Sequence, residues 1–171
     1  TKNFPQQLYS KKESKKMTRD LLSFFFKNYK ETNKPLSKEE QMRHTVFLFG
    51  EAEKGEFCTP KLCESAYQLS EKFGNPPNGS EGLPCGIQML LYNRLLIYFR
   101  VKEEGFSLSD YKQGLKILKN PKAFPKLSAI CMPGVGDADI IKRTIAICFL
   151  YQSIFVTSQK DLYDFLTSYV S

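Results

Sequence analysis

The sequence predicts an all-α fold, a single-domain bundle of about seven helices. Three observations lead to this prediction: capping residues recur along the chain, apolar residues follow them at helical spacing, and Pro- or Gly-rich segments separate the runs. The chain has 171 residues, 42% hydrophobic and 25% charged, which is the balance of a globular domain with one core. No apolar run is long enough to cross a membrane as a helix.

The outer part of the bundle is predicted to be a ring of amphipathic helices behind a basic arm. Residues 1–16 are polar, so we expect a flexible arm there and a helical domain over residues 17–171. Peripheral helices are expected over residues 18–31, 37–55, 59–74, 107–120 and 158–171. Each begins with a Ser or Thr that can act as the N-cap, and the second carries a capping box.

Two long apolar helices are predicted at the centre of the bundle, over residues 87–102 and 137–156. Loops rich in Pro and Gly, at 75–86 and 121–136, precede them. At 100° per residue their apolar positions go right round the cylinder, which indicates burial on every side. The best strand candidate, residues 95–101, lies inside the first of these longer helical patterns.

The charge indicates the kinds of partner to consider. The formal net charge is +7, and 20 of the 25 cationic residues are Lys. Arg suits bidentate reading of phosphate or guanine, so a surface dominated by Lys favours solubility or diffuse attraction to acidic partners. The densest cationic run lies in the arm, at Lys11, Lys12, Lys15 and Lys16. A nucleic-acid contact at this run is the first alternative function.

The leading functional hypothesis rests on the helix at 18–31. Its apolar and aromatic side chains cover a wider arc than a surface helix normally buries. We therefore expect a non-enzymatic adaptor or accessory protein that binds a helical or extended segment of another protein. The residues expected to contact the partner are Phe24, Phe25, Phe26 and Tyr29, with Lys27 and Lys30 at the rim.

A glycine motif strengthens the nucleic-acid alternative. Gly134, Val135 and Gly136 precede an expected helix, and the segment 127–146 resembles the hairpin of the helix-hairpin-helix family. The resemblance implies that backbone N–H groups of Gly134 and Gly136 contact a DNA phosphate. The segment departs from the family pattern at Asp137, Asp139 and Arg143.

A cysteine-dependent hydrolase or transferase is the second alternative. Cys85 lies directly before an expected helix, where the helix dipole would lower the thiol pKa. His44 is the single histidine, so any Cys-His mechanism must use it. No nucleophile signature surrounds Cys85, and we lean against an enzyme.

The cysteines also bear on metals and on the compartment. Cys58 and Cys63 are too loosely spaced for a structural zinc site, and we expect neither a metal nor another cofactor. The five cysteines are an odd number, and no secretory leader opens the sequence. We therefore expect a reducing compartment, the cytoplasm by default, with leaderless export as the open alternative.

Overall fold

The computed structural model describes residues 44–124 and 126–168, and it shows that the predicted all-α fold is wrong. The chain is α/β, and residues 43–165 form one compact unit. The strands are β1 (Thr45–Gly50), β2 (Pro60–Cys63), β3 (Leu95–Arg100), β4 (Leu127–Cys131) and β5 (Ile154–Val156). The helices are α2 (Ala66–Phe73), α3 (Gly82–Leu91), α4 (Leu108–Leu118), α5 (Ala138–Tyr151) and α6 (Gln159–Ser168).

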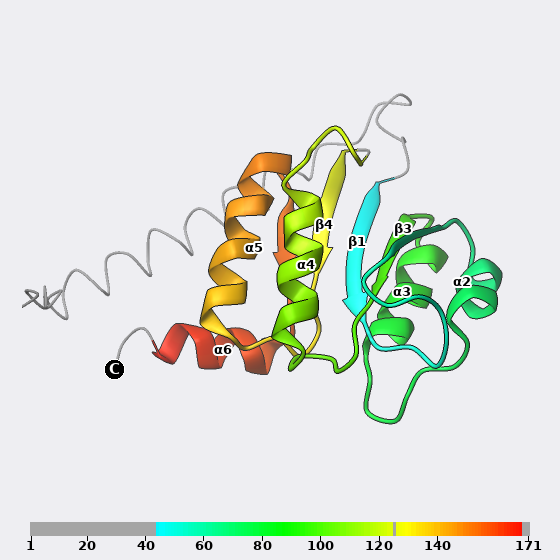
Figure 1. The fold of residues 1–171 in the computed structure, drawn as a ribbon, viewed down its shortest axis with the longest axis horizontal. Coiled ribbons are helices and arrows are strands. Elements are labelled where there is room, and N and C mark those ends of the chain that lie inside the picture. Colours follow the sequence, from blue (N-terminus) through cyan, green and yellow to red (C-terminus); the bar gives the residue numbers. More distant parts are fainter. Residues whose placement is uncertain (1–43, 125, 169–171) are drawn as a thin grey trace, which may run out of the picture. The chain divides into compact units, whose positions relative to one another are not determined.

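The five strands form one mixed sheet in the order β2-β3-β1-β4-β5. β1 lies at the centre and pairs in parallel with β3 on one side and β4 on the other, while β5 pairs in parallel with β4. β2 is an antiparallel strand at the edge next to β3. The connection from β1 to β3 carries α2 and α3, and α4 and α5 lie side by side on the other face of the sheet (Figure 1).

The central strands have no polar face because helices cover both sides of the sheet. All six residues of β1 are buried. Val46 and Leu48 enter the core under α2 and α3, and Phe47 and Phe49 enter the core under α4 and α5. Strands buried on both faces form continuous apolar runs rather than alternating ones, which a helical reading of the sequence can absorb.

This absorption explains the wrong helix predictions. The predicted helix at 37–55 contains β1, and the one at 59–74 is β2 followed by α2. The two predicted central helices are each a helix followed by a strand: 87–102 spans part of α3 and β3, and 137–156 is α5 and β5. The predicted loop at 121–136 contains β4, and α3 begins inside the predicted loop at 75–86.

Left-handed residues mark the places where those helices end. Asn93 has φ 57° between α3 and β3, and Gln152 has φ 53° between α5 and β5. A residue in this conformation stops a helix and turns the chain back, which here sends it into the sheet. The predicted helix at 107–120 is present as α4, and α6 lies within the predicted helix at 158–171. The arm at 1–16 and the helix at 18–31 lie outside the described residues.

An aromatic cluster fixes α4 against the sheet. The ring centroids of Phe49 and Phe99 are 4.9 Å apart, and those of Phe49 and Tyr111 are 5.4 Å apart. Gly114 of α4 faces the Phe49 ring, and a Cβ there would lie 2.8 Å from Phe49 Cζ. The glycine therefore permits the close approach that positions the outer face of α4.

Candidate functional site

In open α/β sheets, ligands bind at the carboxyl ends of strands whose connections leave toward opposite faces. Here those strands are β1, which leads to α2 and α3, and β4, which leads to α5. The place to look for a ligand site is therefore between the loop after β1 and the loop after β4.

That place is filled by a carboxylate of the chain itself. Glu104, in the loop after β3, accepts hydrogen bonds from the N–H groups of Glu51 (3.1 Å), Glu81 (2.8 Å) and Gly82 (3.1 Å), and from Ser80 Oγ (2.8 Å). Glu51 Oε1 in turn accepts from the Glu104 N–H at 2.8 Å. Glu104 therefore occupies the start of α3, where the N–H groups of a helix terminus would otherwise attract an external anion.

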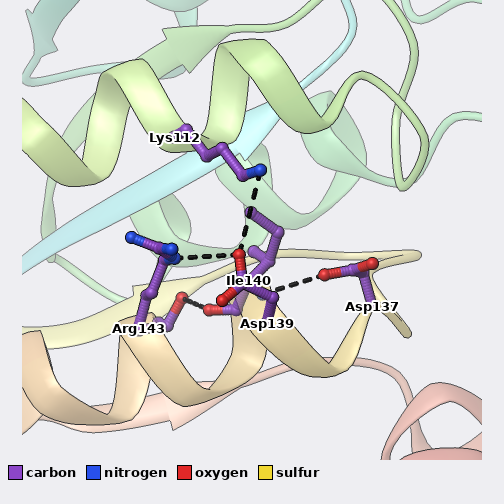
Figure 2. A network of polar contacts seen from close by, with 6 residues as sticks. Lys112, Asp137, Asp139, Ile140 and Arg143 are labelled. Carbon is purple, nitrogen blue, oxygen red and sulfur yellow. Dashed lines mark hydrogen bonds and ion pairs between the residues drawn. The ribbon is translucent and has the colours of Figure 1, made fainter. Parts of the chain in front are cut away.

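The start of α5 is occupied in the same way. Asp137 is its N-cap, and Oδ1 of this residue accepts from the Ile140 N–H at 2.9 Å, as Figure 2 shows. The neighbouring loops also touch, because a Cβ added to Gly105 would collide with the Gly134 carbonyl. The carboxyl edge of the sheet is thus closed, and its helix N-termini at α3 and α5 already hold carboxylates.

The Gly-Val-Gly motif follows a strand, not a helix. β4 ends at Cys131, so the segment is strand, loop and helix, and the resemblance to a helix-hairpin-helix does not extend to the structure. Gly134 has φ 76°, as its turn requires, and Val135 is fully buried. Gly134 and Gly136 therefore lead into a helix terminus that Asp137 caps, which is unfavourable for a phosphate.

The structure does not bring Cys85 and His44 together. His44 precedes β1 and its Nδ1 lies 2.8 Å from Ser128 Oγ, next to the start of β4. Cys85 lies in the first turn of α3, whose first residue approaches Gly50 at the opposite end of β1. Burial raises the pKa of the Cys85 thiol, and Glu81 and Glu104 raise it further, which is opposite to the direction expected from the helix dipole.

The remaining predicted residues give no further centre. Cys58 and Cys63 are free thiols, and no group of three or more His, Cys, Asp and Glu among the described residues could hold a metal ion. The expected contact residues Phe24, Phe25, Phe26, Lys27, Tyr29 and Lys30, and the lysines at 11, 12, 15 and 16, lie outside the described residues.

The strongest candidate is a basic groove between α4 and α5. Its volume is about 380 Å³, and the residues that line it are Lys112, Leu115, Lys116, Lys119, Arg143 and Ile147. The floor is apolar, because Leu115 and Ile147 are buried members of the core. The lysines fall four and three residues apart on α4, so they share one face of the helix and form one wall. We call this site the α4–α5 groove.

One carboxylate lies at an end of the α4–α5 groove. Asp139 Oδ2 is 2.9 Å from Arg143 Nε and 3.8 Å from Lys112 Nζ, and the three side chains converge in Figure 2. The hydrogen bond from Arg143 holds the pKa of Asp139 below its usual value, with help from the charges of Lys112 and Lys142. Within the described part of the chain no carboxylate pairs with Lys116 or Lys119, which leaves the middle of the groove positively charged.

The sequence analysis missed this groove. The signal on α4 was present: Lys112, Lys116 and Lys119 stand at helical spacing inside a helix that was predicted with nearly the right bounds. The contribution of Arg143 had no such signal, because it depends on α5 packing beside α4.

No family model matches this chain, and neither a curated protein nor a solved structure matches it. Every helix within residues 44–124 and 126–168 falls short of the length and hydropathy that a membrane crossing demands.

Proposed function

We propose that this chain is a non-enzymatic binding protein whose α4–α5 groove takes an acidic segment of another protein. The observation that carries the proposal is the pairing of a buried apolar floor, Leu115 and Ile147, with cationic walls. An amphipathic acidic segment complements both features, since its apolar side chains can lie on the floor while its carboxylates face the lysines.

The dimensions of the groove agree with a short peptide. From Lys112 to Lys119 the groove follows α4 for seven residues, or about 10 Å at 1.5 Å per residue. That length suits about two turns of a helix or three extended residues. Segments of this size are recognised through a few anchoring side chains.

Nucleic acid fits the groove less well than an acidic peptide. No aromatic side chain lines the groove to stack on a base, and its one arginine is already bonded to Asp139. Lys-rich walls attract phosphates without reading a sequence, so the apolar floor would have no role in such a complex.

The test is fluorescence anisotropy with the full chain and a labelled probe peptide of about 15 residues with Leu and Glu at amphipathic helical spacing. We expect micromolar binding that weakens with added salt, and a loss of about tenfold or more in Lys116→Glu/Lys119→Glu. Lys54→Glu is the matched control, because Lys54 is exposed and lies outside the groove.

Three results would contradict the proposal. The first is no binding of the probe, and the second is equal binding by the double variant. The third is tighter binding of a single-stranded DNA of about 20 nucleotides than of the peptide, which would favour the nucleic-acid alternative.

A further inference from the structure

A second surface stands out because it carries no charge. Residues 82–93, which form α3 and the turn after it, contain no Asp, Glu, Lys or Arg, in a chain that is 25% charged. The other described helices, α2, α4, α5 and α6, each carry acidic and basic side chains. An uncharged helix is expected to be buried, and the sequence analysis placed residues 87–102 at the centre of the core for this reason.

The structure leaves one side of α3 in solvent. Leu91 and Tyr92 are each 75% exposed and Ile87 is 39% exposed. At 100° per residue, Ile87 and Leu91 lie 40° apart on the helix, and Tyr92 follows on the same side. We call these three side chains the α3 face.

The opposite side of α3 already meets the needs of the chain's own core. Leu83 and Gly86 are buried there, and Met89 and Leu90 pack against the same cluster. The α3 face is therefore apolar surface that this core does not use. Exposed apolar patches of this kind mark sites of association.

We propose that two copies of this chain pair through their α3 faces. The charge distribution favours a second copy over a partner with a charged surface. Each copy carries a formal net charge of +7, so two copies repel wherever their cationic surfaces meet, as at the α4–α5 groove. The α3 face has no charge to oppose its own image, and a two-fold dimer requires one patch that is complementary to itself.

The size of the α3 face indicates a weak dimer. A standard interface buries about 800 Å² on each partner, with an apolar centre and a polar rim. Three side chains can supply the centre only, so the rim must come from polar neighbours such as the exposed Gln88 and Asn93. We expect dissociation in the micromolar range.

The test is sedimentation velocity of the full chain from about 1 to 300 µM. The parent should shift from monomer to dimer across this range, and Leu91→Glu and Tyr92→Glu should each weaken association at least tenfold. Both variants should fold like the parent, as far-UV circular dichroism can check, because the two side chains are largely exposed. Phe106→Glu is the control: Phe106 is 72% exposed, lies outside α3, and its replacement should leave the dimer unchanged.

A parent chain that stays monomeric throughout the range would overturn the proposal, and so would a Leu91→Glu variant that dimerises like the parent. Equal weakening by Phe106→Glu would also overturn it, because the association would not be specific to α3. The proposed peptide binding is measured separately and does not depend on these outcomes.

Discussion

Replacing Glu104 by Ala should destabilise the fold more than any other single change at the carboxyl edge of the sheet. The carboxylate accepts four hydrogen bonds, three from backbone N–H groups and one from Ser80. A hydrogen bond to a charged group contributes about 1.5–3 kcal/mol, but the sum is not additive, and water can replace part of it because Glu104 is half-buried. We expect a loss of about 2–4 kcal/mol, comparable to removing a strong helix cap together with a loop anchor.

Glu104→Gln gives an intermediate case. One amide oxygen can still accept from Glu51, Ser80 and Gly82, but the NH₂ group then faces the Glu81 N–H, so we expect a loss of about 1–2 kcal/mol. Urea unfolding followed by circular dichroism measures both changes, and about 2–4 °C in Tm should accompany each kcal/mol in a chain of this length.

The control is Glu103→Gln, which changes the exposed neighbouring carboxylate and should stay within about 0.5 kcal/mol of the parent. The reasoning is refuted if Glu104→Ala is as stable as the parent, or if Glu103→Gln loses as much as Glu104→Gln.

Two further predictions concern the core and the thiols. Gly114→Ala should cost about 1–2 kcal/mol in urea unfolding, because the added Cβ would lie 2.8 Å from Phe49 Cζ and 3.1 Å from Phe99 Cε1 and so overpacks the aromatic cluster. Gln113→Ala on the same helix is its control, and a Gly114→Ala variant more stable than the parent would contradict the packing. Cys85 should react with iodoacetamide more slowly than glutathione at pH 8, since burial, Glu81 and Glu104 raise its pKa and so lower its thiolate fraction. Its rate should go on rising at pH values where an ordinary thiol has levelled off, and labelling faster than glutathione at pH 7 would show that the thiol is activated.

The sequence predicts helices here better than it predicts the sheet. α4 begins after Ser107 and has an apolar stripe on one side, and the structure has a helix there. β1 has the residues Thr-Val-Phe-Leu-Phe-Gly, which show no alternation because the strand is buried on both faces. The preceding capping box at 37–40 then favoured a helix through this run, and nothing local opposed it.

The boundaries inside 87–102 and 137–156 show a second limit. Asn93 is a residue type that adopts the left-handed conformation readily, so it was a usable stop signal between α3 and β3. Gln152 does the same work after α5 without belonging to that class of residue. The α4–α5 groove lay beyond sequence reasoning for a related reason: half of it is a packing relation between helices that β4 separates along the chain.

The position of β1 has a consequence for the chain as it leaves the ribosome. β1 is complete at Gly50, yet its first parallel neighbour ends only at Arg100. At about 5–20 residues per second, the most apolar strand of the sheet waits roughly 3–10 s for its pairing partner. During that interval Val46, Phe47, Leu48 and Phe49 form a short, uncharged, β-prone stretch of the kind that chaperones bind and that aggregates nucleate on.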